Sequence, residues 1–368
     1  MIKNESALQT SQPRLSNIQA LRGLAAFLVM LAHLAIIERK YSQDTLLPEI
    51  LGFGLSGVDI FFVISGFIMV YVTHKWAGQA ARHIPEFLYA RITRIYPLYW
   101  AVSAALLIVY LIRPEWVFAS SGLEPNILKS FLLWPDKAYP MLEVGWTLIH
   151  EMGFYFIFAL ILIASRRLRP LLICVWAALV IGGYAIGLHT HGPLTAIIFH
   201  PLSLEFCGGA LLGYWLLKPA RLTTAAPLLI ASLVFFIASI FIHIMTGQIY
   251  PGIGWMRPAT FGVAAIVLVL ASYLFEQQGK TAPRWSVILG DWSYALYLTH
   301  VLSLSLIGRI WAGFDKPGVL DNLIMLPLML IAALIVAGLA HRLIEAPIMR
   351  ATKYMRQNYA ARRTDNRS

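Results

Sequence analysis

The chain has 368 residues, of which 59% are hydrophobic and 13% are charged, and its mean hydropathy is +0.70. Soluble domains carry about twice that share of charge, so the composition excludes an ordinary soluble protein and indicates a membrane protein with several spans. The net charge of +11 would suit nucleic acid, but basic cytoplasmic loops explain it better, and we expect no nucleic-acid partner.

Ten apolar segments are long enough to cross a bilayer. We place them at residues 18–37, 50–71, 95–113, 144–164, 170–188, 198–217, 226–245, 255–275, 286–307 and 324–344. Glycines in the second segment predict that it is broken or re-entrant. We therefore predict an all-α fold: a polytopic bundle of about ten transmembrane helices within residues 18–347, with no fused soluble domain.

The two ends of the chain differ in composition from this bundle. Residues 1–17 are polar and no small-residue cleavage site follows the first apolar run, so we expect a cytoplasmic tail and no removable signal peptide. Residues 348–368 form a basic tail. We expect it to be disordered from Ala351 onward and to lie near anionic lipid headgroups.

The basic residues of the loops predict the orientation. Of the 29 Lys and Arg residues, 20 fall in one set of alternate loops and 8 in the other, with Arg22 inside the first helix. The positive-inside rule then makes both termini cytoplasmic. The longest outer loop, residues 113–143, carries Trp116 and Trp134, which suit either a cap over an outward-facing site or an interfacial aromatic belt.

Four ionisable residues in different spans are predicted to reach a similar depth in the outer half of the membrane. They are His33, Asp59, Glu151 and His300. Any one of them could be a satisfied core residue, but unpaired charges in lipid cost several kcal/mol each, so four at one level indicate a functional layer.

Three arginines are predicted nearer the cytoplasmic face. Arg22 lies eleven residues before His33, which is ~16 Å along a helix. Arg91 and Arg94 project to one side just before the third span. Guanidinium groups at a membrane mouth suit phosphate, although positive-inside topology alone could also place them there.

Six segments resemble, in order, the motifs of the membrane acyltransferase 3 family. They are Arg22 to His33, Gly57 to Phe67, Arg91 to Pro97, Gly145 to Tyr155, Ser293 to His300, and Glu345 to Pro347. The resemblance covers about residues 16 to 347. His150, directly before Glu151, departs from the family pattern, which has an aromatic residue there.

The resemblance implies an enzyme of the bacterial inner membrane that moves acyl groups, often acetyl, from cytoplasmic acyl-CoA. Its acceptor would be a hydroxyl of a cell-surface or exported polysaccharide or of its lipid-linked precursor, as in the exopolysaccharide and O-antigen (lipopolysaccharide) branch. Acetyl-CoA would be a substrate, and no permanently bound cofactor or metal is expected.

The family motifs, read with the chemistry of the side chains, assign roles. Arg22, Arg91 and Arg94 would bind acyl-CoA. His33 would act as general base or would itself carry the acyl group, and Glu151 or Asp59 would orient it. Trp146, Tyr297 and His300 are candidate contacts to the acceptor or to the developing oxyanion.

A secondary transporter is the alternative. Its intramembrane His, Asp and Glu residues would form a proton relay. Transporters often contain inverted repeats, and the sequence shows none.

Overall fold

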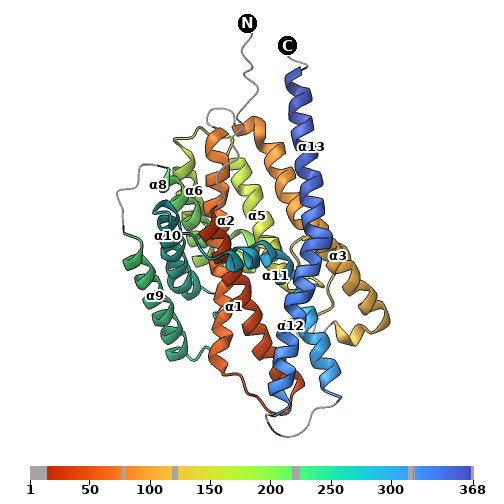
Figure 1. Cartoon of the computed structure of the whole chain (residues 1–368). Coiled ribbons are helices and arrows are strands. Elements are labelled where there is room, and N and C mark those ends of the chain that lie inside the picture. Colours follow the sequence, from red (N-terminus) through yellow and green to blue (C-terminus); the bar gives the residue numbers. More distant parts are fainter. Residues whose placement is uncertain are drawn as a thin grey trace.

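The computed structural model describes residues 15–76, 80–117, 123–217, 224–252, 254–313, 318 and 320–365, with residues 356–365 described by their backbone alone. Every regular element in these ranges is a helix (Figure 1). The α-helices are α1 (Ser16–Tyr41), α2 (Gly57–Thr73), α3 (Ile84–Ile112), α4 (Ile127–Leu132), α5 (Trp146–Ile161), α6 (Arg169–Ala185), α7 (Pro193–Ile198), α8 (Ser203–Leu216), α9 (Ala226–Met245), α10 (Val263–Gln277), α11 (Arg284–Trp311), α12 (Asn322–Ala340) and α13 (Ala346–Asp365).

Short 3₁₀ and π segments extend or connect these helices. They are η1 (Glu49–Ser56), η2 (His74–Trp76), η3 (Ala80–His83), η4 (Pro114–Trp116), η5 (Glu143–Gly145), η6 (Leu188–Thr190), η7 (Pro258–Gly262) and η8 (His341–Glu345), of which η7 and η8 are π-helical.

Each of the ten predicted segments coincides with a helix, which confirms the all-α bundle. Eight helical stretches among the described residues are long and apolar enough to cross a membrane. Helix α6 has 17 residues and falls short in length. Helix α11 has 28 residues and is long enough, but it is not among the eight because buried hydroxyl and imidazole side chains lower its hydropathy. Several of these side chains belong to the site described below.

The second span is one continuous helical stretch, Glu49–Trp76, and is neither broken nor re-entrant, although its helix type changes. The chain runs as the 3₁₀ segment η1 up to Ser56 and as α2 from Gly57. A Cβ atom at Gly57 would lie 2.3 Å from the carbonyl oxygen of Ala25, so only glycine allows this close approach to α1.

Two close helix pairs fix the registers that build the site. A Cβ at Gly290 of α11 would lie 1.9 Å from the carbonyl oxygen of Gln19 in α1, and one at Gly209 of α8 would lie 2.0 Å from that of Val63 in α2. Small residues let helix backbones touch in this way inside membranes.

Both ends of the bundle region lie at the same face. The Glu276 carboxylate at the end of α10 accepts hydrogen bonds from the Ser16 and Asn17 amides, at 2.8 and 2.6 Å, and so caps α1. At the end of α12, Gly338 packs against Trp292, which lies early in α11. The chain thus enters and leaves the bundle on one side.

The prediction of a disordered tail is wrong for residues 351–365. Helix α13 continues through Asp365 and projects beyond the bundle (Figure 1). Ala and Arg, the most frequent residues in this segment, are strong helix formers, and the segment contains no Gly or Pro, which favours the helix.

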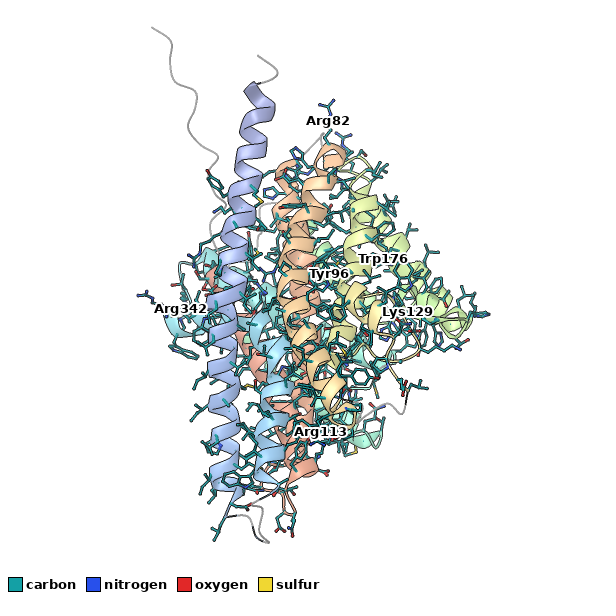
Figure 2. The ribbon with its side chains drawn as sticks, turned by 90° about the vertical axis from the view of Figure 1, so that its right-hand side faces the viewer. Arg82, Tyr96, Arg113, Lys129, Trp176 and Arg342 are labelled. Atoms are coloured by element: carbon teal, nitrogen blue, oxygen red, sulfur yellow. The ribbon has the colours of Figure 1, made fainter. Side chains whose placement is uncertain are left out.

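The loop between α3 and α5 lies against the side of α3. Residues 118–122 of this loop fall outside the described residues. Three backbone carbonyl groups of α4 accept hydrogen bonds from side chains of α3. These hydrogen bonds are Tyr96 Oη to the Leu132 oxygen (2.8 Å), Tyr99 Oη to the Ser130 oxygen (2.6 Å) and Trp100 Nε1 to the Phe131 oxygen (2.9 Å). Figure 2 accordingly shows Lys129 beside α3, between the levels of Tyr96 and Arg113. Gly145 packs on the Tyr99 ring, so α5 begins halfway along α3.

Candidate active site

Five helices line a cavity of about 100 Å³ whose walls are mostly apolar but carry a group of polar side chains. Its polar lining comes from α1 (Arg22), α2 (Ser65), α3 (Arg91, Arg94), α5 (Thr147, Glu151, Tyr155) and α11 (Ser293, Tyr294, Tyr297). The structure therefore brings together all three arginines that the sequence predicts, and adds Glu151 to them.

The arginines reach this cavity with few protein partners. Arg22 Nη1 donates a long hydrogen bond, 3.4 Å, to Gln19 Oε1. The Arg91 guanidinium lies over the Tyr155 ring at 5.8 Å, and its buried Nε has no hydrogen-bond partner. Arg94 makes no hydrogen bond or ion pair with any residue that the structure describes. Much of this hydrogen-bonding capacity is open to a ligand.

Glu151 is held by two hydroxyl groups. Its Oε1 accepts a hydrogen bond from Ser65 Oγ at 2.9 Å and a second one from the Tyr155 hydroxyl. The prediction that Glu151 shares the depth of His33 is wrong. Glu151 shares a cavity with Arg22, which lies eleven residues, or ~16 Å, before His33 on α1. The cause is that α5 begins beside the middle of α3 in space, a position that the boundaries of the apolar segment in the sequence do not reveal.

The cavity is elongated along the bundle axis. Its lining positions on α2 run from Val58 to Met69, eleven residues or ~16 Å of helix rise. Arg91 and Arg94 lie at one end, and Thr147 and Tyr297 lie toward the other.

His33 of α1 meets His300 of α11 beyond that second end. His33 Nδ1 lies 3.2 Å from His300 Nε2, and the ring centroids are 4.9 Å apart in an edge-on arrangement. His300 is fully buried, whereas His33 is partly accessible. The Tyr297 ring, which lines the cavity, lies 5.9 Å from the His300 ring, so the histidine pair lies next to the cavity lining.

Two further predicted residues, Tyr297 and Trp146, lie in or next to the cavity wall at the end remote from Arg91 and Arg94. Tyr297 Oη forms a 2.8 Å hydrogen bond with Thr147 Oγ1, which itself donates to the Val144 carbonyl at 3.0 Å. Trp146 opens α5 and places its ring edge-on to His150 at 5.6 Å.

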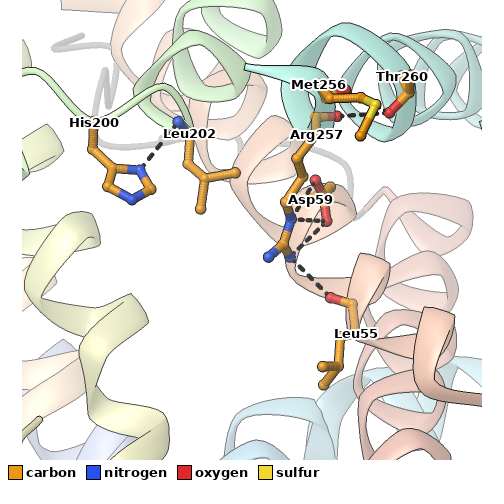
Figure 3. A network of polar contacts seen from close by, with 7 residues as sticks. All are labelled: Leu55, Asp59, His200, Leu202, Met256, Arg257 and Thr260. Carbon is orange, nitrogen blue, oxygen red and sulfur yellow. Dashed lines mark hydrogen bonds and ion pairs between the residues drawn. The ribbon is translucent and has the colours of Figure 1, made fainter. Parts of the chain in front are cut away.

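Asp59 is paired with an arginine that the sequence reasoning missed. Arg257 Nε lies 3.0 and 3.1 Å from the two Asp59 oxygens, Arg257 Nη2 lies 2.8 Å from Oδ2, and Nη2 also donates to the Leu55 carbonyl (Figure 3). Both side chains are almost completely buried. The sequence offered one sign that Arg257 could be buried: it directly precedes Pro258, at the start of an apolar span.

Two histidines and a carboxyl group surround this ion pair. The His150 and His200 rings stand edge to face with centroids 4.4 Å apart, and Leu202 donates its amide proton to His200 Nδ1 (Figure 3). Glu205 of α8 is buried beside Asp59, and its two oxygens have no hydrogen-bond donor among the described residues. His33 therefore has His300 as its partner, while Asp59 and Glu151 are engaged elsewhere.

Comparisons with known proteins identify the class of chemistry. A family model described as "Acyltransferase domain" matches residues 15–342. The chain is 29% identical to the exopolysaccharide production protein ExoZ of Rhizobium meliloti (strain 1021) over 314 residues, which cover 81% of this chain and 90% of that protein. It is 27% identical to the acyltransferase MdmB of Streptomyces mycarofaciens over 373 residues, 92% of each chain. No solved structure matches the chain.

Proposed function

Because the chain belongs to the acyltransferase domain family and is therefore a membrane acyltransferase, we propose that it transfers acetyl from acetyl-CoA to a carbohydrate hydroxyl. The family match confirms the resemblance noted in the sequence, and it favours an enzyme over the transporter alternative. The observation that carries the proposal is the elongated cavity with three weakly partnered arginines at its inner part.

The charge of this cavity favours an anionic donor. The cavity lining contains three positively charged side chains, those of Arg22, Arg91 and Arg94. Two carboxylates lie near them: Glu151 in the same lining, and Glu345 near Arg22. An uncompensated guanidinium in a membrane protein is costly, and a phosphate group would compensate it through paired hydrogen bonds. The phosphates of acyl-CoA meet this need.

The shape of the cavity suits a long and narrow arm. The distance of ~16 Å from the level of Val58 to that of Met69 matches a pantetheine chain that leads from the phosphates to the thioester. Ligand pockets usually enclose about 300 to 1,000 Å³. A cavity of about 100 Å³ must therefore widen when the donor binds.

His33 would work at the far end of this arm. As general base it would take the proton of the acceptor hydroxyl while the hydroxyl oxygen attacks the thioester carbon. The C–S bond then breaks, and the thiolate takes that proton to leave as CoA. The alternative relay, in which His33 is itself acylated, needs the same side chain at the same place.

The carbohydrate acceptor is supported by one relative. ExoZ is named as an exopolysaccharide production protein, and this chain covers 90% of its length. Trp146 directly precedes Thr147, which lines the cavity, and its indole ring would offer a face on which a sugar ring can pack.

Release of CoA tests the proposal directly. Purified protein in detergent, given acetyl-CoA and an acceptor oligosaccharide, should release free CoA and yield an acetylated sugar by mass spectrometry. A panel of longer acyl-CoA donors serves as the control for chain length. Absence of sugar-dependent CoA release across acceptors and donors would reject the proposed donor and acceptor.

The proposed orientation places both chain ends in the cytoplasm of the cell that carries this inner-membrane enzyme, as the loop charges indicate. Single cysteines test it in a variant that lacks Cys174 and Cys207. A membrane-impermeant maleimide added to spheroplasts should label Lys137→Cys and not Arg82→Cys, both of which are exposed positions. The opposite pattern would reverse the donor side.

A further inference from the structure

The contact between His33 and His300 joins two helices across 267 residues of sequence. Asp59 bonds Arg257, and Glu151 bonds Ser65 and Tyr155, so neither carboxylate is the partner of His33. A second histidine occupies the place that a carboxylate often takes beside a catalytic histidine.

The backbone determines where both imidazoles carry their protons. His300 Nδ1 lies 2.9 Å from the Leu296 carbonyl oxygen, and His33 Nδ1 lies 2.9 Å from that of Val29. A carbonyl oxygen only accepts, so each Nδ1 of the neutral rings is protonated. His300 Nε2 is then a bare acceptor, and the Nδ1–H of His33 is shared between Val29 and His300. The remaining atom, His33 Nε2, is left as a basic lone pair.

We propose that His300 is a positioning residue that orients His33 with Nε2 as its basic atom and stabilises the imidazolium formed during transfer. This inference rests on the proposed function. The hydroxyl proton moves to His33 Nε2 as the C–O bond forms, and it passes to the departing thiolate as the C–S bond breaks. Throughout the reaction, His33 Nδ1–H remains directed at His300, whose own proton stays on Nδ1.

This assignment replaces the expectation that His300 contacts an oxyanion. Its single N–H is already donated to Leu296, and its other nitrogen is an acceptor that faces His33. A ring in this state has no donor to offer to a negative oxygen. Oxyanion contacts would have to come from other groups, of which Tyr297 lies one helical turn away.

Two substitutions separate positioning from packing. His300→Leu fills similar space and removes the acceptor, whereas His300→Gln supplies an amide oxygen that can accept from His33 Nδ1–H. We expect His300→Leu to lower kcat about tenfold or more, the factor that one hydrogen bond represents, with the KM for acetyl-CoA unchanged. His300→Gln should regain most of the lost kcat.

His243 provides the matched control. It is fully buried in α9, and its Nδ1 also lies 2.9 Å from a carbonyl oxygen, that of Ser239, but its Nε2 has no partner. His243→Leu should leave kcat near the wild-type value. Equal losses in His300→Leu and His300→Gln, or wild-type kcat in His300→Leu, would overturn the positioning role.

A readout without turnover keeps the test independent of the proposed substrates. In wild-type protein labelled with ¹⁵N-histidine, the His300 signal, identified by its loss in His300→Gln, should show a protonated Nδ1 and a bare Nε2. A protonated Nε2 would reject the positioning role even if transfer occurs. Failure of CoA release with the expected His300 signal would instead reject the donor and acceptor.

Discussion

Two clusters of charge inside the bundle share helix α2 and differ in burial and in how completely their guanidinium groups are paired. Asp59 and Arg257 meet through contacts of 2.8 to 3.1 Å, and Arg257 also reaches the Leu55 carbonyl. On another side of α2, three arginines line the cavity, and Arg91 Nε and Ser293 Oγ have no hydrogen-bond partner among the described residues. Buried polar groups in proteins are normally satisfied. The unpartnered atoms beside Asp59 belong to the carboxyl group of Glu205, whereas those of the cavity include a guanidinium that keeps its charge, so the cavity is the cluster that expects an anionic ligand.

The comparison separates two uses of an intramembrane charge. A paired charge fixes how helices meet, and removing one partner leaves the other uncompensated. An unpaired cluster contributes little to the stability of the fold, because its groups form their hydrogen bonds only when a ligand binds to the folded protein. The predictions below test this difference.

The largest effect is expected on the stability of the paired cluster. Arg257→Met removes the guanidinium that, among the described residues, faces the Asp59 and Glu205 carboxyls, and loss of one partner of a buried ion pair costs about 3–5 kcal/mol. The apparent melting temperature in detergent should fall clearly, and further than in Asp59→Asn, where Glu205 still neighbours Arg257. Arg91→Met is the matched control from the cavity and should melt close to wild type. Equal melting of Arg257→Met and Arg91→Met would refute the distinction.

The next effect falls on turnover. His33→Ala should lower transfer by at least ~10²-fold, the usual contribution of a general base, while the protein still accumulates in the membrane. His243→Ala, which also removes a buried histidine, should retain activity. Wild-type turnover in a well-expressed His33→Ala protein would exclude His33 from the chemistry.

The sequence predicts these regions to different degrees. The all-α class and the arginine cluster follow from hydropathy and from the arginines before the third span, and the structure confirms both the helical bundle and the gathering of Arg22, Arg91 and Arg94. Depth could not be predicted for Glu151. Hydropathy marks where a segment is apolar, but α5 starts halfway along α3 because the preceding loop packs against Tyr99.

Partners across long separations also escape the sequence. Arg257 pairs with Asp59 across 198 residues, and as a loop arginine it counted only toward topology. His300 was predicted at the right level but not as the partner of His33, because the rotation of α11 depends on the contact at Gly290. Such rotations are determined by packing between helices.

A smaller effect is expected on donor affinity in the unpaired cluster. Arg91→Ala or Arg94→Ala should raise the apparent KM for acetyl-CoA roughly ten- to a hundred-fold, the value of one charged contact to phosphate, and leave that for the sugar nearly unchanged. Lysine at either position should restore only part of the affinity for acetyl-CoA, because an ammonium group cannot form the bidentate contact to phosphate. If Lys restores affinity fully, these arginines act only as positive charges that set the topology.

The smallest effect concerns the hydroxyls that hold Glu151. Ser65→Ala removes one donor, but Tyr155 still donates to the same oxygen and water in the cavity can replace the lost bond, so we expect less than a tenfold decrease in kcat. Tyr155→Phe keeps the ring beneath Arg91 and should cost a similar amount. The double variant should cost more than the product of the two, because Glu151 then loses both protein donors at once. Steady-state kinetics of the two single variants, the double variant and Glu151→Gln decide the matter: if Ser65→Ala alone is as damaging as Glu151→Gln, the serine hydroxyl takes part in the reaction and does not merely hold the carboxylate.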